Sequence, residues 1–363
     1  MTAPTGMMGA LLMIFVLILL TSASYGQEDD DSSEEDPPVF GQPIETTTTT
    51  PTTKRCGRFK KNTCVRRDKC EETALNVRKI IIDLGEPPSN TCHYLETCCP
   101  RNKIRAGING IDGSTTHNSQ CGVKNVDGIY MTVKGGDLET SFGEYPWVMA
   151  IIDAAQKFVC TGTLIAYDVV LTTATCIAGA QQLTVRGGEW DLMTENEFVA
   201  HVNIKVKSPI LHEKFNWEST ENNIALLILE RAFPHQQHIA PICLYDDYAE
   251  VSYEECFITG WRSRLMRKFT RHTVVKVDVA IDNGTCSVNS VSTVICATEQ
   301  STQPIYARGA PMVCPTDSSS YHIIGTWSTR TNGKTFFTDV RQFGGWIREK
   351  VTLFGINLDS TDM

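Results

Sequence analysis

The segment Leu171-Thr172-Thr173-Ala174-Thr175-Cys176 decides how the second half of the chain is interpreted. Six other short motifs are also rich in apolar or β-branched residues, and all but the third contain Gly, Cys or Trp: Phe142-Gly143-Glu144-Tyr145-Pro146-Trp147, Cys160-Thr161-Gly162-Thr163-Leu164-Ile165, Asn223-Ile224-Ala225-Leu226-Leu227, Pro241-Ile242-Cys243-Leu244, Thr259-Gly260-Trp261 and Gly309-Ala310-Pro311-Met312-Val313-Cys314. Short runs of this composition are typical of buried strands. The segment therefore belongs to a domain built from β-strands.

The region from Cys121 to about Phe354 repeats this pattern. Its apolar runs are Trp147–Ile152, Thr163–Ile165, Val169–Leu171, Ile224–Leu229, Cys256–Thr259 and Ile323–Trp327. Clusters of Gly, Asn, Asp and Pro separate the runs, which indicates an all-β barrel or sandwich. Only Val340 to Lys350 carries apolar residues at helical spacing, so one helix is expected near the C-terminus.

The seven motifs stand in the order and spacing of the chymotrypsin-like serine proteases, and this region resembles that family. The resemblance implies an all-β, chymotrypsin-like fold of two six-stranded antiparallel β-barrels with a cleft between them and a short C-terminal helix. It also implies four disulfides, which together use the eight cysteines of the region: Cys121–Cys243, Cys160–Cys176, Cys256–Cys314 and Cys286–Cys296. Such bridges stabilise a fold by roughly 2–4 kcal/mol each.

The catalytic residues of that family are replaced in this chain. The reaction needs a serine nucleophile, a histidine that accepts its proton and a buried aspartate that orients the imidazole. By the resemblance, Arg308, Thr175 and Asn223 hold these three positions. A threonine accepts no proton near neutral pH, an amide carries no charge, and an arginine stays protonated. The sequence therefore predicts a pseudoprotease and no enzyme.

The positions that support catalysis in the family are altered as well. Activation there frees an N-terminal Ile or Val whose ammonium pairs with an Asp; here Val133 does not follow a basic residue, and Ala307 replaces the Asp. Tyr306 replaces a glycine that donates an oxyanion-hole N–H. Thr302 stands at the floor of the specificity pocket and Thr335 at one of its wall glycines. Activation, oxyanion stabilisation and substrate binding are all expected to be lost.

Six cysteines crowd the segment upstream of the protease-like region: Cys56, Cys64, Cys70, Cys92, Cys98 and Cys99. This density indicates a small domain stabilised by disulfides. A zinc site is the alternative, but no Cys-x-x-Cys pair occurs, and spacing alone leaves the pairing open. The order resembles the clip domain of arthropod haemolymph proteases. For residues 56–99 the resemblance implies the pairs Cys56–Cys98, Cys64–Cys92 and Cys70–Cys99.

The N-terminus predicts secretion. An apolar run from Met7 to Leu20 precedes small residues and a cleavage site at Ser24-Tyr25-Gly26, the pattern of a signal peptide over residues 1–26. A membrane anchor is the alternative, but the run is shorter than the ~20 residues that a span requires. We therefore expect a secreted, extracellular protein whose cysteines form disulfides.

Composition divides the rest of the chain. Residues 27–55 are acidic and then rich in Thr and Pro, with few large apolar side chains, which predicts a disordered linker. The protease-like domain is expected over residues 121–354, followed by a tail at 355–363. The sequon at Asn283 predicts a glycosylation site in a secreted chain.

The linker between the two cysteine-containing domains, residues 100–120, is polar and contains Arg101, Lys103 and Arg105. Exposed basic linkers are the usual sites of proteolytic cleavage. Cleavage is predicted after one of these three residues, with the bond from Arg105 to Ala106 preferred. No predicted disulfide spans that bond, so a cut would let the clip domain separate.

Further candidate groups predict no metal and no cofactor. His235 and His238 lie three positions apart but have no nearby acidic or cysteine ligands in the sequence, so a zinc site there is not expected. His212 follows an apolar run and is interpreted as a strand-end residue. The clip segment carries eight basic residues against six acids, which favours either an acidic partner or a solvated face.

The net charge excludes one class of partner, and the family resemblance suggests a function in binding. The chain has 33 Lys and Arg residues against 42 Asp and Glu, a net charge of −9, which argues against a nucleic-acid partner. The resemblance implies a cofactor or adaptor in an extracellular cascade that helps an active clip-domain protease to activate prophenoloxidase in melanisation and innate immunity. The alternative is an adhesion or pattern-recognition protein that uses the inactive fold to bind microbial surfaces or matrix.

Overall fold

The computed structural model describes residues 54–71, 80–84, 92–105, 120–245, 250–262, 271–282, 293–301, 305, 307–317 and 320–358. These residues belong to one compact unit, Glu45–Met363. The expected signal peptide, most of the acidic linker, and the positions Asn283, Thr302 and Tyr306 lie outside the described residues.

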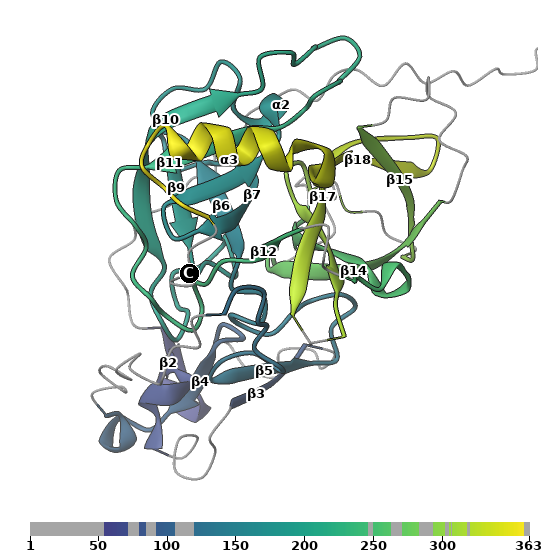
Figure 1. The fold of residues 1–363 in the computed structure, drawn as a ribbon. Helices are drawn as coiled ribbons and strands as arrows, with labels where there is room; N and C mark the ends of the chain where they lie inside the picture. The colour runs from purple at the N-terminus through teal and green to yellow at the C-terminus, as the bar shows by residue number, and fades with distance from the viewer. Residues whose placement is uncertain are drawn as a thin grey trace, which may run out of the picture. The chain divides into compact units, whose positions relative to one another are not determined.

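Six strands form the first barrel: β6 (Val148–Ile152), β7 (Phe158–Ala166), β8 (Val169–Thr172), β9 (Thr184–Gly187), β10 (Val202–Leu211) and β11 (Ala225–Leu229). They close in the order β10-β11-β8-β7-β6-β9, with every pair antiparallel (Figure 1). All residues of β6, β8 and β11 are buried, which explains why these strands appear in the sequence as continuous apolar runs.

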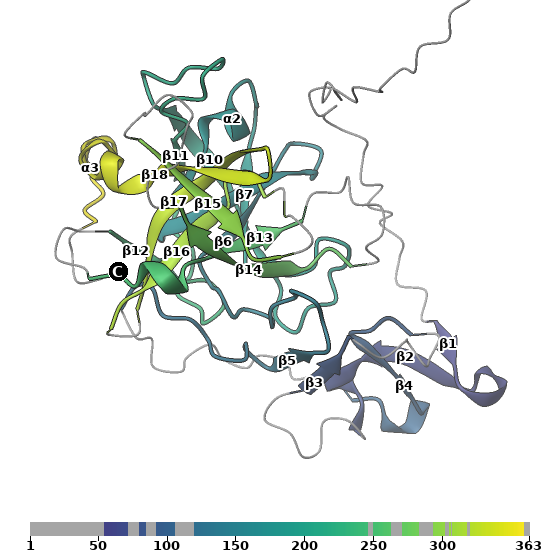
Figure 2. The same cartoon turned by 90° about the vertical axis from the view of Figure 1, so that its right-hand side faces the viewer.

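Six more strands form the second barrel: β13 (Phe257–Trp261), β14 (Val274–Ile281), β15 (Val294–Glu299), β16 (Pro311–Pro315), β17 (Tyr321–Thr331) and β18 (Lys334–Asp339). The order β17-β16-β13-β14-β15-β18 closes because β17 also pairs with β18 (Figure 2). A short strand, β12 (Cys243–Leu244), runs parallel to β17. The prediction of an all-β double barrel is confirmed.

Buried tryptophans link the two barrels. Trp190, after β9, donates its indole N–H to the carbonyl of Thr140 at 2.9 Å, and Trp261 in β13 donates to the carbonyl of Trp190 at 3.1 Å. Both side chains are almost fully buried. Each ring therefore fills the core while its one polar atom is satisfied, as burial of an indole requires.

The C-terminal helix is present and begins with a tighter turn than expected. Residues Val340–Phe343 form a 3-10 turn, and α3 runs from Gly344 to Thr352. The Asp339 side chain accepts a hydrogen bond from the Arg341 amide at 3.2 Å, which caps the turn. Ile347 and Val351 are buried in α3, so the helix packs on the barrel body.

The clip region contains a three-stranded sheet with the order β1-β2-β4, formed by β1 (Arg55–Cys56), β2 (Asn62–Arg66) and β4 (Glu96–Cys99). A separate strand, β3 (Ile80–Asp83), pairs in parallel with β5 (Met131–Lys134). Short 3-10 turns lie at Arg58–Lys60, Arg67–Lys69, Arg101–Lys103 and, beyond the clip, Tyr253–Glu255. One short helix, α2 (Ala174–Ile177), follows β8.

Six disulfides join described cysteines: Cys56–Cys98, Cys64–Cys92, Cys70–Cys99, Cys121–Cys243, Cys160–Cys176 and Cys256–Cys314. Each is a pair that the two family resemblances imply. Cys286 lies outside the described residues, so the pair Cys286–Cys296 stays a prediction. None of the helices formed by described residues is long and apolar enough to cross a membrane.

Candidate functional site

Thr175 and Asn223, two of the expected triad positions, lie together at the junction of the two barrels. Thr175 is in α2, and Asn223 precedes β11 and is fully buried. The Thr175 amide donates to Asn223 Oδ1 at 2.9 Å. Asn223 Nδ2 donates to Thr175 Oγ1 at 3.2 Å and to Ser328 Oγ, in β17, at 2.7 Å. Both polar atoms of the Asn223 side chain are therefore hydrogen-bonded within the protein.

The orientation of the Asn223 amide follows from its partners. A backbone N–H can only donate, so the atom that faces the Thr175 amide must be the oxygen. The nitrogen then faces the two hydroxyl groups, of Thr175 and Ser328, which can both accept. Neither Asn223 nor Thr175 can act as a general base near neutral pH, so this cluster links secondary-structure elements and moves no proton.

Arg308 occupies the turn before β16, at the expected nucleophile position. Its carbonyl accepts a hydrogen bond from the Thr161 amide at 3.0 Å, and its side chain is partly buried. Burial lowers the pKa of the Arg308 guanidinium, but an arginine remains a cation at neutral pH. The next residue, Gly309, has φ +76°, and a Cβ there would lie 2.2 Å from the Thr161 carbonyl, so only glycine fits.

The expected activation residues form regular structure. Val133 lies within β5, opposite Ile82 of β3, and its amide donates to Ser141 Oγ at 3.0 Å. Ala307 is 2% exposed and offers no carboxylate to an N-terminal ammonium. Val133 therefore already has β-sheet partners, and the acid that an active relative would need is missing.

A buried ion pair lies beside the expected pocket wall at Thr335. The Glu299 carboxylate, whose side chain is 0% exposed, lies 2.8 Å from Arg330 Nη1. It also accepts hydrogen bonds from Thr335 Oγ1 at 2.6 Å and from the Ile305 amide at 3.0 Å. These groups come from β15, β17, β18 and the segment before β16. Among the described residues, the Glu299 carboxylate therefore has an ion-pair partner and two hydrogen-bond donors, and it is not left as an unpaired charge.

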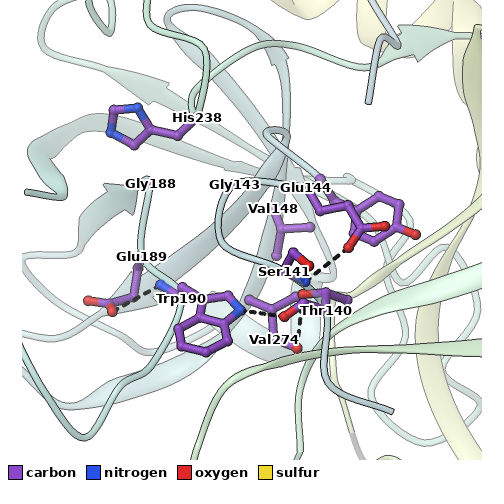
Figure 3. Close-up of a pocket in the computed structure, with 11 residues that line it drawn as sticks. Thr140, Ser141, Gly143, Glu144, Val148, Gly188, Glu189, Trp190, His238 and Val274 are labelled. Carbon is purple, nitrogen blue, oxygen red and sulfur yellow. Dashed lines mark hydrogen bonds between the residues drawn. The ribbon is translucent and has the colours of Figure 1, made fainter. Parts of the chain in front are cut away.

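A cavity elsewhere in the structure does not involve the triad positions. It is lined by Thr140, Ser141, Gly143, Glu144, Tyr145, Val148, Gly188, Glu189, Trp190, His238 and Val274 (Figure 3). Most of its polar atoms bond one another; for example, the Ser141 amide donates to Glu144 Oε2 at 2.9 Å. His238 Nε2 is buried without a hydrogen-bond partner. Burial lowers the pKa of His238 to about 4, so its imidazole is neutral.

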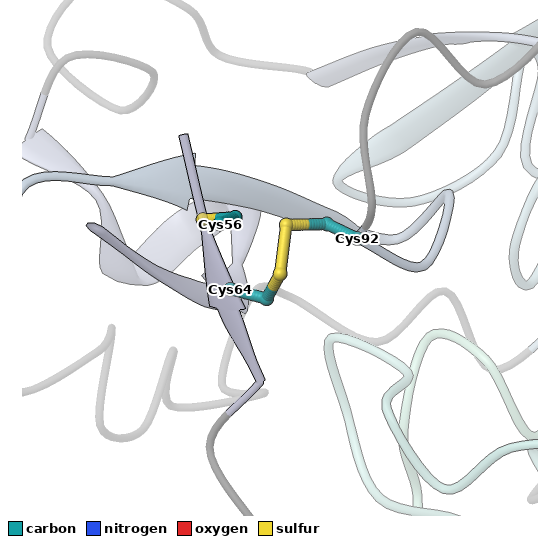
Figure 4. Close-up of side chains that lie close together, drawn as sticks. All are labelled: Cys56, Cys64 and Cys92. Carbon is teal, nitrogen blue, oxygen red and sulfur yellow. A yellow bond between two sulfur atoms is a disulfide. The ribbon is translucent and has the colours of Figure 1, made fainter. Parts of the chain in front are cut away.

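The sulfur atoms of Cys56, Cys64 and Cys92 have the spacing that a metal ion requires. All three cysteines are in disulfides, as Figure 4 shows for Cys64–Cys92, so they offer no thiolate ligand.

The side chains of Glu189, Glu197 and His201 also lie within 4.8 Å of one another. Arg186 Nη1 is 3.1 Å from Glu189 Oε2, and His201 Nδ1 is 3.3 Å from the same oxygen. Burial and the neighbouring Glu189 raise the pKa of Glu197 to about 10, so Glu197 keeps its proton at neutral pH. Protein groups therefore balance the charge of this cluster.

Comparison with known proteins identifies the family. The trypsin family model matches residues 134–347, and the chain belongs to that family. It is 26% identical over 309 residues to inactive CLIP domain-containing serine protease A8 of Anopheles gambiae, which covers 77% of this chain and 84% of the relative. This chain is a clip-domain serine protease homologue. Because two similar relatives are named inactive clip-domain proteases, the homologue is a pseudoprotease.

Two further relatives extend the likeness. The homologue is 30% identical over 276 residues to phenoloxidase-activating factor 2 of Galleria mellonella, which covers 65% of this chain and 90% of the relative. It is 26% identical over 186 residues to inactive serine protease scarface of Drosophila melanogaster, over 50% of this chain and 28% of that protein. The predicted resemblance to clip-domain serine protease homologues is confirmed, because relatives with such names match most of the chain.

Three residues that make contacts at or beside the expected site positions were not identified from the sequence: Ser328, Glu299 and Arg330. Ser328 follows Trp327, and nothing in its neighbourhood marks it as a partner of Asn223. Glu299 and Arg330 lie 31 positions apart on β15 and β17, and only the barrel closure brings them together. A lone acid at the end of an apolar strand was the one available signal for Glu299.

Proposed function

We propose that Thr175, Asn223 and Arg308 are former catalytic positions, and that the homologue acts by binding, as a non-catalytic cofactor in an extracellular proteolytic cascade. The observation that carries the proposal is the hydrogen-bonded Asn223 amide, which joins α2 and β17 and leaves no polar atom of its own for a substrate. A chain that keeps both barrels and uses this junction for structure can still present surfaces to a partner.

The proposed partners are an active clip-domain protease, prophenoloxidase, or both. One relative is named a phenoloxidase-activating factor and matches over 90% of its own length, which supports a role in prophenoloxidase activation, melanisation and innate immunity. A cofactor of this kind acts stoichiometrically, because it forms a complex and turns nothing over. Its effect should saturate near equivalence with the partner that it binds.

We also propose a domain organisation and secretion. A signal peptide occupies residues 1–26 and an acidic linker 27–55, and the clip domain, the cleavable linker and the protease-like domain follow at 56–99, 100–120 and 121–354, with a tail at 355–363. Six disulfides among the described residues support folding in an oxidising compartment. Asn283 would carry a glycan, and Cys286 would pair with Cys296.

For the processing site, the described part of the linker favours Arg105. Arg101–Lys103 form a 3-10 turn directly after the clip sheet. Arg105 is exposed, its amide donates to the Lys69 carbonyl at 3.0 Å, and its guanidinium reaches the Glu71 carbonyl at 3.2 Å. The peptide bond after Arg105 therefore follows an exposed residue that hydrogen bonds hold in place. The bond after Arg101 lies within the 3-10 turn, and the bond after Lys103 lies at its end.

Contacts between the clip region and the protease-like region bear on whether the clip domain would separate after cleavage of the linker. Tyr94, before β4, donates a hydrogen bond to Asp191 Oδ2, which is fully buried, and Arg66 Nη1 donates to the Glu197 carbonyl at 2.9 Å. The β3–β5 pairing adds main-chain contacts. We therefore propose that the clip domain stays associated after cleavage, which revises the expectation from disulfides alone that it separates.

A reconstitution experiment tests the cofactor proposal. Purified homologue, cut or uncut, is added over a range of ratios to prophenoloxidase and an active clip-domain protease, and phenoloxidase output is measured. Output should rise in proportion to the cut homologue, reach a plateau near equivalence, and stay at background when the protease is omitted. A flat response at every ratio, together with tight binding to matrix or microbial polysaccharide, would favour the adhesion alternative.

A further inference from the structure

The loop between β1 and β2 holds an aromatic ring among positive charges. Phe59 is 77% exposed, and every residue of the tip Gly57–Lys61 is exposed. Arg58 Cζ lies 5.4 Å and Lys61 Nζ lies 5.9 Å from the centre of the Phe59 ring. The ring therefore stands in solvent with cations over it, where it contributes nothing to the core.

The backbone of this tip is strained. Phe59 has φ +64° and Lys60 has φ +53°, so two successive side chains occupy the left-handed region that glycine prefers. The conformation is held from both sides, because Cys56 is bonded to Cys98 and the Lys60 amide donates to the Gly57 carbonyl at 3.0 Å. Strain kept at an exposed aromatic residue is typical of a functional site and is hard to explain by folding alone.

The charge around the tip is uncompensated. Residues 54–71 contain eight Lys and Arg side chains against two acids, and one of these acids, Asp68, is buried in an ion pair with Arg66 at 2.6 Å. Within the described ranges, no carboxylate pairs with Arg58, Lys60 or Lys61. This end of the clip sheet is positive although the whole chain is negative, so it suits an anionic partner.

The shape of the tip decides between anionic partners. Binding sites for small anionic ligands are concave and enclose their ligand. The loop that joins β1 and β2 projects from the sheet instead (Figure 2), and each residue of Gly57–Lys61 is exposed. A flat bilayer surface needs no enclosing site: cations approach the headgroups while an aromatic ring enters the acyl boundary.

We infer that the tip Gly57–Lys61 binds membrane surfaces rich in anionic phospholipid. Arg58, Lys60 and Lys61 supply the attraction to the headgroups, and Phe59 inserts between the lipids. Each cation near such a surface contributes about a fivefold gain in affinity. Insertion of the Phe59 ring adds roughly tenfold or more. Salt weakens the electrostatic part, because the charges are exposed and screened.

Vesicle co-sedimentation with the full-length protein tests this inference. Vesicles of equal parts phosphatidylcholine and phosphatidylglycerol should bind the wild-type protein, and vesicles of phosphatidylcholine alone should not. Phe59→Ala should weaken binding about tenfold, and the pair Lys60→Glu and Lys61→Glu at least about 25-fold. These residues are exposed, so the variants should unfold at the wild-type temperature.

Matched controls separate the tip from general charge and hydrophobicity. The pair Lys205→Glu and Lys207→Glu makes the same change in net charge at exposed positions of β10, and Leu353→Ala removes an apolar side chain that is 73% exposed. Neither should alter vesicle binding. Equal losses in these controls, wild-type binding by the tip variants, or capture by heparin without capture by vesicles would each overturn the inference; the last result would assign the tip to polyanionic glycans.

Discussion

Asn223 Nδ2 lies 2.7 Å from Ser328 Oγ, so the position expected to hold a catalytic aspartate ties the loop before β11 to β17. Thr338 of β18 adds a second tie, because its hydroxyl donates to the Asn223 carbonyl at 2.9 Å. Both bonds run from the first barrel to the second. Asn223, at the position expected to orient a histidine in an active relative, thus helps to hold the two barrels together.

Introducing a serine, a histidine and an aspartate at the expected triad positions should not confer activity. The variant Thr175→His, Asn223→Asp and Arg308→Ser still lacks an acid at Ala307 to receive an N-terminal ammonium. It also keeps the Glu299–Arg330 ion pair beside Thr335, the expected pocket wall. We expect no hydrolysis of trypsin-, chymotrypsin- or elastase-type peptides and no fluorophosphonate label, in the variant or in the wild type. Labelling of the triple variant at its restored nucleophile would show that the remaining losses had been overrated.

Breaking the buried ion pair should destabilise the second barrel. Glu299→Gln leaves Arg330 with no charged partner in a buried setting, and such losses cost about 3–5 kcal/mol. The urea midpoint should fall accordingly. Asp278→Asn is the matched control, since Asp278 is 58% exposed in its pair with Lys276 and such pairs contribute about 1 kcal/mol at most. Similar midpoints for the two variants would contradict the assignment.

Acid should destabilise the fold through His238. Burial lowers its folded pKa to about 4, below the unfolded value near 6.5, so the unfolded chain takes up the proton first as the pH falls. The stabilising contribution is complete above pH ~6.5 and is lost between that pH and pH ~4, with a slope of at most ~1.4 kcal/mol per pH unit. Urea unfolding across this range should show the decline.

The variant His238→Asn isolates this effect. Asparagine can keep the hydrogen bond to the Ala200 backbone but cannot titrate, so the stability of the variant should depend less on pH than that of the wild type. His235→Asn is the control, because it makes the same substitution at an exposed imidazole that stacks on Tyr167. An identical slope in all three proteins would rule out His238 as a source of the acid sensitivity.

Cutting the linker should not release the clip domain. After cleavage at Arg105, confirmed by a new N-terminus at Ala106, the two fragments should co-elute in gel filtration without denaturant. Tyr94→Phe removes a hydrogen bond to the buried Asp191 carboxylate and should weaken the association by about 1.5–3 kcal/mol, so that dilution separates the fragments. A new N-terminus at Val133 would instead place the cut within β5.

Replacing Phe59 by glycine should stabilise the protein. The residue has φ +64°, which costs an aromatic side chain roughly 1–2 kcal/mol and costs glycine nothing. We expect Phe59→Gly to raise the midpoint of thermal unfolding, although the flexibility of glycine offsets part of the gain. Phe59→Ala should give no comparable increase, because alanine keeps the strain. Equal unfolding temperatures for both variants would show that the loop relaxes without glycine.

The barrels were predictable because their signals are local. Runs such as Val169–Leu171 and Ile224–Leu229 are continuous and apolar because β8 and β11 are buried on both faces. The first turn of the C-terminal helix was not predictable in detail. Its 3-10 geometry depends on the Asp339 cap, and an isolated acid before an apolar segment does not specify the type of turn.

The sequence predicts that the catalytic residues are replaced, but it does not predict which contacts form in their place. Motif spacing predicts Thr175, Asn223 and Arg308 as the former catalytic positions, because each stands inside a recognisable motif. Ser328 and the Glu299–Arg330 pair could not be found in this way, since their partners are distant in sequence and meet only after the strands are in register. The same holds for Tyr94 and Asp191, whose contact depends on how the clip region packs.

The buried Glu299–Arg330 pair constrains how this chain can change over generations. A mutation that removes either charge alone leaves the other buried and uncompensated, so the single-step intermediate folds poorly. Changes at the two positions are therefore expected to occur together.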